Sequence, residues 1–375
     1  MLVVSLGGTA GLREADALLV ASLRRAGADV AVASVAWSRE LPTLALHELG
    51  WALAARRAAA RAVAEASPRA VLYSTVTAAL LGPVPGAIRF DAPAAGNRPG
   101  RHGLWQRPLE RRRFASARLL VPWSDGGLAE APPAPRAEAV VVPVPVERSG
   151  ESGPRDIAAI TYAANPAKKG LDIVLRAWAA AAREGEELVV AGVDEAEGAR
   201  WLSRALAGAA PGTSTPPGTA GPGPAGAGTA GARASGAAPS PGAGTASPAG
   251  GAPLAGRVRF AGLLARDEYR ALLRRSRVFL NAARREDYGI AQLEALADGC
   301  LLVTTPSPGP YAALPLARAL DARLVGPELA IRTALDDPLP DYGERAAAAV
   351  APFSPAAVDR VVAEQLLPRL LGAFA

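Results

Sequence analysis

The sequence predicts an α/β protein made of two Rossmann-like, doubly wound domains that face each other across a cleft. The chain has 375 residues, which leaves room for two domains. Short apolar runs alternate with segments of helical periodicity, as parallel strands alternate with their crossover helices. A polar stretch at 147–155 interrupts this series. We therefore expect one domain over residues 1–150 and a second over residues 155–350.

The first domain opens with a strand, a glycine-rich turn, a helix and a second strand. The apolar run 2–6 precedes the turn 7–11, and helical periodicity follows over 12–26. The turn contains Gly8, where the backbone could approach a phosphate or an acceptor group, although a plain tight turn explains the pattern as well. The next strand is expected at 30–33. Later strands are expected at 70–74, 87–91, 119–122 and 139–144, and helices at 51–66 and 104–117.

The segment 98–118 is rich in arginine. It holds seven arginines, with Leu104, Trp105, Leu109 and Phe114 among them. One interpretation is a surface that binds anionic membranes. The other is a helix whose apolar face packs inside the domain while its arginines are solvated.

The second domain repeats the alternation around an unusual insert. A strand at 157–162 leads through a turn to a helix at 171–182, and further strands are expected at 188–192, 258–262 and 278–281. Between them, residues 208–252 consist of Ala, Gly, Pro, Ser and Thr with a single arginine. Such a composition cannot bury a core, so we expect a disordered insert. A final helix at 354–375 is expected to cross back to the first domain.

The segment 285–305 predicts a loop, a helix and a buried strand. Glu286 lies in the loop and Glu294 in the helix, eight positions apart. That spacing is at most ~12 Å along a helix, comparable with the length of a nucleotide-sugar. The backbone N–H groups of Gly289, Ile290 and Ala291 lie between the glutamates and would point at an anion. The carboxylates can accept hydrogen bonds from sugar and ribose hydroxyls.

This arrangement, with Tyr-Gly before the helix and Ala-Leu-Ala-Asp-Gly at its end, resembles the signature of GT-B glycosyltransferases of the retaining, family-four type. The resemblance implies that Glu286 and the helix amides hold the sugar and phosphates, and that Glu294 holds the ribose. It also implies that Lys169, which precedes Gly170 at a helix start, stabilises the leaving diphosphate. Neighbouring residues in a helix do not share a face, so Lys168 is expected to point to solvent. Gly262 would lie near the base.

Two features of that family are absent. Ala164 stands where the family has an arginine five residues before the lysine, so Asn165 or an arginine from elsewhere would compensate. The family's first-domain histidine is also missing. Asp91, after the strand 87–91, or His102 could take its place.

The resemblance implies a retaining glycosyltransferase that moves a sugar from a nucleotide-diphosphate-sugar donor to an unknown acceptor. It implies no metal and no other cofactor. Two alternatives share the donor site: a GT-B-fold nucleotide-sugar epimerase, and a non-catalytic nucleotide-sugar-binding protein.

Composition adds limits on partners and location. The net charge of +6 favours acidic partners, yet only 5% of residues are aromatic, which argues against a nucleic-acid surface. The single cysteine, Cys300, excludes an intramolecular disulfide and is expected in the core. With two histidines it makes a structural zinc site improbable. The N-terminus lacks a signal-peptide pattern and no apolar run of 18 residues occurs, so we expect a cytoplasmic protein, with peripheral contact at the inner membrane face left open.

Overall fold

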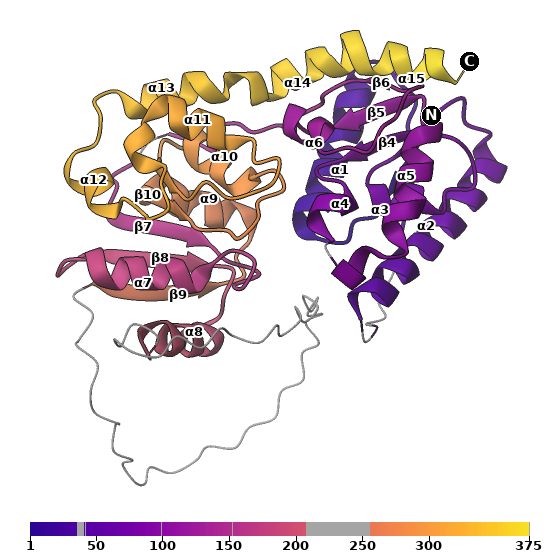
Figure 1. Ribbon diagram of the computed structural model, residues 1–375. Helices are drawn as coiled ribbons and strands as arrows, with labels where there is room; N and C mark the ends of the chain where they lie inside the picture. The colour runs from indigo at the N-terminus through magenta and orange to yellow at the C-terminus, as the bar shows by residue number, and fades with distance from the viewer. Residues whose placement is uncertain (36–40, 42, 99, 152, 208–255, 375) are drawn as a thin grey trace, which may run out of the picture.

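The computed structural model describes residues 1–35, 41, 43–98, 100–151, 153–207 and 256–374. Two separate parallel sheets form its framework (Figure 1). One has the strand order β2-β1-β3-β4-β5-β6, and the other β11-β10-β7-β8-β9. The prediction of two α/β domains is confirmed. The predicted insert at 208–252 lies outside the described residues.

The N-terminal domain places helices on both faces of its sheet. Side-chain oxygens of Thr9, Thr43 and Thr75 accept backbone N–H groups at the starts of α1, α2 and α3, as good N-caps do. The strands are β1 (Leu2–Ser5), β2 (Ala31–Ser34), β3 (Val71–Tyr73), β4 (Ala87–Phe90), β5 (Leu119–Pro122) and β6 (Glu138–Ala139). The helices are α1 (Ala10–Arg25), α2 (Leu44–Ala66), α3 (Val76–Leu80), α4 (Ala94–Asn97), α5 (Gln106–Ser116) and α6 (Asp125–Ala129), with a 3-10 turn at Gly100–Gly103.

The strand expected at 139–144 differs in its bounds. Only Glu138–Ala139 form β6, but the Val140 and Val142 N–H groups still donate to the Leu120 and Pro122 carbonyls of β5, each at 2.9 Å. Val140, Val142 and Val144 are buried, and this alternation produced the strand-like pattern. Beyond Val142 the chain leaves the sheet edge, and the Val144 N–H donates to the Tyr288 hydroxyl of the second domain at 3.1 Å.

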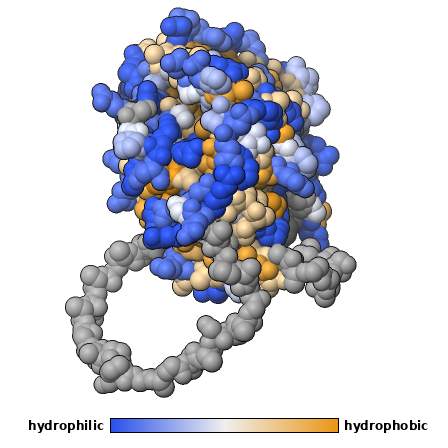
Figure 2. Space-filling view, turned by 90° about the vertical axis from the view of Figure 1, so that its left-hand side faces the viewer, coloured by the Kyte–Doolittle hydropathy of each residue, from blue (hydrophilic) through white to orange (hydrophobic). Residues whose placement is uncertain are grey.

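The C-terminal domain encloses the larger core. Its strands are β7 (Ile157–Tyr162), β8 (Glu187–Ala191), β9 (Arg257–Gly262), β10 (Ser276–Asn281) and β11 (Leu301–Thr304). Its helices are α7 (Leu171–Ala181), α8 (Glu195–Ala207), α9 (Arg266–Arg275), α10 (Ile290–Ala297), α11 (Ala313–Leu320), α12 (Ile331–Asp336) and α13 (Tyr342–Val350). The outward side of this domain is largely hydrophilic, with smaller apolar areas (Figure 2).

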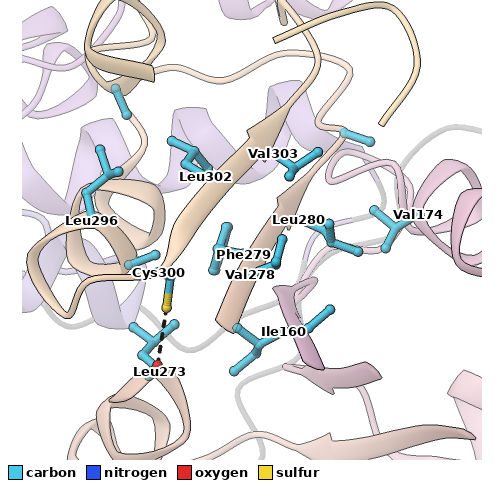
Figure 3. Packing of buried hydrophobic residues seen from close by; sticks show 14 of the residues in the cluster. Ile160, Val174, Leu273, Val278, Phe279, Leu280, Leu296, Cys300, Leu302 and Val303 are labelled. Atoms are coloured by element: carbon cyan, nitrogen blue, oxygen red, sulfur yellow. Dashed lines mark hydrogen bonds between the residues drawn. The ribbon is translucent and has the colours of Figure 1, made fainter. Parts of the chain in front are cut away.

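Cys300 belongs to this core, as expected. Its thiol lies 3.2 Å from the Leu273 carbonyl oxygen, beside Leu302 and Phe279 (Figure 3). Burial raises the pKa of Cys300 to about 12. The thiol is therefore protonated and inert at neutral pH.

The C-terminal helices lie on the N-terminal domain. These are α14 (Pro355–Val361), a π-helical turn (Val362–Leu366) and α15 (Leu367–Ala373). Val358, Val362, Leu366 and Leu370 are buried in a cluster with residues of α1, β3 and β5. The helical stretch Tyr342–Ala373 is also long and apolar enough, by length and composition alone, to cross a membrane, which the sequence pattern did not single out. Only 22% of its most apolar window is buried, so packing on the N-terminal domain covers a minor part of it.

Ion pairs and packed rings join the two domains. Arg285 of the C-terminal domain donates to Glu130 of the N-terminal domain at 2.6 Å. The rings of Trp123 and Tyr288 meet edge to face, with centroids 5.3 Å apart. Arg266 pairs with Glu14 of α1. These contacts all involve residues near the carboxyl ends of strands, where α/β proteins bind their ligands.

Candidate functional site

The loop between β10 and α10 ends in an open helix N-terminus. Gly289 adopts a left-handed conformation with φ 94°, and a Cβ there would lie 2.8 Å from the Tyr311 ring. Both facts require glycine. No side chain caps α10, so its first amides, at half-buried Ile290 and Ala291, are available to an anion.

Lys169 and Glu286 form the central pair beside this helix. The Lys169 Nζ lies 2.7 Å from Glu286 Oε2. The Gln292 amide, on the first turn of α10, donates to the same oxygen at 2.9 Å. Glu286 and Gln292 are buried, while the Lys169 side chain is 20% exposed. An ammonium, a carboxylate and free helix amides therefore meet in one place.

Lys168 reaches the same loop and does not point to solvent as expected. That expectation required the two lysines to lie within a helix. Both residues instead precede α7, in a turn that ends at Gly170 with φ 64°. Lys168 Nζ lies 2.7 Å from Asp287 Oδ2, and its side chain is 44% exposed. Burial alone would raise the pKa of Asp287, but Lys168 and Arg285 hold it below its usual value.

Glu294 lies further along α10, between the side chains of two arginines. Its Oε1 forms an ion pair with Arg266 at 2.9 Å and accepts a hydrogen bond from Arg270 at 3.2 Å. Burial raises the pKa of Glu294, and the two arginines oppose that rise. Within the described part of the chain no hydrogen bond reaches Oε2. One oxygen is thus fixed, and the other remains as an acceptor.

Asp91 faces this loop from the N-terminal domain. It follows β4, is half-buried, and its Oδ1 accepts the Ala92 N–H at 2.8 Å. Burial raises the pKa of Asp91, the Asp287 carboxylate raises it further, and Lys168 opposes both. The structure therefore brings Asp91 within electrostatic reach of the loop that carries Glu286. The side chain of His102, the alternative, is outside what the structure describes.

Three other predicted residues are less directly involved. The Asn165 side chain accepts the Lys168 N–H at 3.0 Å and so shapes the lysine turn. Gly262 ends β9 with φ 70° and open space where a Cβ would stand. Gly8 is exposed and equally open, and the positive φ in its turn belongs to Gly7.

The sequence reasoning missed Arg266, Arg270, Arg285 and Gln292. Arg266 and Arg270 stand four residues apart on α9, a spacing that places both on one face of a helix. The sequence therefore predicts that Arg266 and Arg270 share a face of the helix, but not that this face contacts Glu294. Among the described residues, no group of three or more His, Cys, Asp or Glu side chains could hold a metal ion.

Comparisons with known proteins support the fold. No family model matches the chain, and no curated protein does. Among solved structures, Anabaena HepE in complex with UDP and glucose is similar at a TM-score of 0.63 and 14% identity, covering 97% of this chain and 98% of that one. Sucrose-phosphate synthase from Thermosynechococcus elongatus is similar at 0.63 and 12%, with 99% and 98% covered. WaaG, a glycosyltransferase involved in lipopolysaccharide biosynthesis, is similar at 0.55 and 12%, with 97% and 95% covered. The chain therefore has the two-domain GT-B fold of these glycosyltransferases.

Proposed function

We propose that the protein is a retaining glycosyltransferase that transfers a sugar from a nucleotide-diphosphate-sugar donor to an acceptor. The observation that carries the proposal is the convergence of Lys169, Glu286 and the uncapped start of α10, with Glu294 further along the same helix. Fold alone would not support an activity. This set of side chains matches the chemistry that a sugar diphosphate requires.

The donor lies along α10 in this proposal. Its diphosphate accepts hydrogen bonds from the free amides of Ile290 and Ala291, and the positive end of the helix adds to the attraction. Its sugar hydroxyls bind Glu286. Its ribose donates to the unoccupied Oε2 of Glu294, which Arg266 and Arg270 hold in place through Oε1. The base extends toward Gly262.

Catalysis then depends on charge at the leaving group. As the bond between the sugar and the diphosphate breaks, negative charge grows on the phosphate oxygens, and the Lys169 ammonium stabilises it. Glu286 and Gln292 position that ammonium before the donor arrives. We assign Asp91 to the acceptor side, where its raised pKa suits it to exchange a proton with an attacking hydroxyl. With a cation and helix amides in place, the reaction as proposed requires no metal.

A panel of nucleotide-sugars tests the proposal by thermal shift. UDP-glucose is the first probe, because HepE was solved with UDP and glucose. We expect one nucleotide-sugar to raise the melting temperature. At a hundredfold excess over Kd, its binding adds about 2.7 kcal/mol to the free energy of unfolding. Proton NMR of the product formed with a trial acceptor then gives the anomeric configuration, which should equal that of the donor. A product with the inverted anomeric configuration would contradict retention. A panel in which no nucleotide-sugar raises the melting temperature would contradict the donor site.

A further inference from the structure

The outer helical layer of the N-terminal domain carries features that the proposed reaction does not use. Helices α2, α3 and α5 lie together on the side of this domain that faces away from the C-terminal domain (Figure 1). Arg56 of α2 donates to the Leu81 carbonyl at 3.1 Å, and Arg113 of α5 donates to the Leu80 carbonyl at 2.9 Å. Helices α2 and α5 are thus both hydrogen-bonded to the end of α3, and the three helices form one surface.

That surface is strongly basic. Burial lowers the pKa of Arg113, and the nearby charges of Arg112 and Arg56 lower it further, so the three cations lie close together. The acids of these helices do not balance them. Glu48 and Glu110 are buried, Glu48 is paired with Arg98, and only Glu65 of α2 is exposed. The exposed arginines of this layer are Arg56, Arg57, Arg61, Arg101, Arg111 and Arg112.

The same layer exposes large apolar side chains. Leu104 is 62% exposed, Leu46 49% and Leu53 38%, and these are three of the five large apolar residues exposed in the described part of the chain. The Trp105 indole donates to the Ala45 carbonyl at 3.1 Å, which brings Leu104 to the start of α2 beside Leu46. Leu46 and Leu53 are seven positions apart and so share one face of α2. Clustered exposure of this kind marks an interaction surface.

We propose that this basic helical face, made of the exposed arginines and the three leucines, docks on an anionic lipid bilayer. Arginines bind the phosphate headgroups, and the leucines insert at the boundary with the acyl chains. A nucleic acid would satisfy the arginines but would leave the leucines in water. The face differs from the segment 98–118 expected from sequence, because Arg98 and Arg113 are bound internally and Phe114 is fully buried, whereas α2 contributes half of the surface.

Vesicle sedimentation with the full chain tests the proposal. Vesicles of phosphatidylglycerol and phosphatidylcholine are compared with vesicles of phosphatidylcholine alone at low salt. A charge variant carries Arg57→Glu and Arg112→Glu, and an apolar variant carries Leu46→Ser and Leu104→Ser. A control carries Arg200→Glu and Arg318→Glu, which makes the same charge change at exposed arginines of the C-terminal domain. Circular dichroism establishes that each variant is folded.

We expect the chain to bind the anionic vesicles and not the neutral ones. Each arginine near such a surface contributes about 5-fold in partitioning, so the charge variant should bind at least ~25-fold more weakly. The apolar variant should also bind more weakly, and the control should bind like the wild type. The proposal is overturned by absent binding, by an equal loss in the control, or by an apolar variant that binds normally, since the last result means adsorption of a polycation without insertion. None of these readouts depends on transferase activity.

Discussion

Replacing Lys169 by alanine should separate catalysis from folding. The Lys169 ammonium lies 2.7 Å from Glu286 beside the open end of α10 and is mostly shielded from water. Two unit charges 4 Å apart interact by about 4 kcal/mol at an effective dielectric constant of 20, which bounds what the lysine can contribute to a leaving diphosphate. Losing one preorganised electrostatic contact typically costs ~10²–10³ in kcat. We expect Lys169→Ala to fall within that range.

Lys168→Ala is the matched control. Lys168 has the same charge and the same turn, but it is more exposed, and its partner Asp287 keeps Arg285 as a second cation at 2.7 Å. We expect kcat within a few-fold of wild type. The assay is the release of nucleoside diphosphate at saturating donor, with calorimetry of donor binding beside it. Equal losses in the two variants, or a larger loss for Lys168→Ala, would refute the assignment of the catalytic cation.

Three further predictions follow from individual contacts. Burial raises the pKa of Asp91, so folding favours its protonated form, and the charged form costs stability above the folded-state pKa. Asp91→Asn should therefore have a higher melting temperature than wild type at pH 7, and the difference should vanish below the unfolded-state pKa of about 3.9. The variant should also lose turnover. A lower melting temperature than wild type at pH 7 would contradict the assignment of a raised pKa. Gly170→Ala places a Cβ at a left-handed φ and in overlap with the Ala282 carbonyl. Urea unfolding should therefore show a loss of ~2–4 kcal/mol in the free energy of unfolding. Gly262→Ala, where φ is positive but the space is open, should lose only ~1–2 kcal/mol. Arg266→Ala removes a bridge between Glu14 and Glu294 that is 42% exposed on the arginine side. The melting temperature should barely change, since exposed pairs contribute ~0–1 kcal/mol, while the donor KM rises; an unchanged KM would remove Arg266 from the donor site.

The parallel α/β framework could be predicted because its signals are local. Apolar runs such as Leu188–Ala191 and glycines such as Gly170 and Gly299, both with positive φ, mark strands and helix ends within a few residues. The loop and helix from Glu286 to Glu294 were predictable for the same reason. The segment 140–144 shows the limit, because Val140 and Val142 continue the hydrogen bonds to β5 while Val144 bonds Tyr288 of the other domain. The alternating valines do not reveal where that change of partner occurs.

The contacts between distant residues could not be predicted. Glu294 was assigned to the ribose with no protein partner, yet its Oε1 is bound by Arg270, which is 24 positions away and set by the packing of α9 on α10. Lys168 was expected to point to solvent, but Asp287, 119 positions away, binds it. Periodicity describes one element at a time, so partners fixed by tertiary packing remain invisible to it.

The most direct test of the donor site is calorimetric titration of the nucleoside diphosphate whose sugar form stabilises the protein in the panel. The free Oε2 of Glu294 is assigned to the ribose, so Glu294→Ala should lose most of the binding while circular dichroism and the melting profile still report a folded chain. Glu294→Gln keeps the shape of the side chain and an oxygen acceptor but removes the charge, and it should fall between the two. An affinity for the nucleoside diphosphate that is the same in wild type and Glu294→Ala would contradict the placement of the donor along α10.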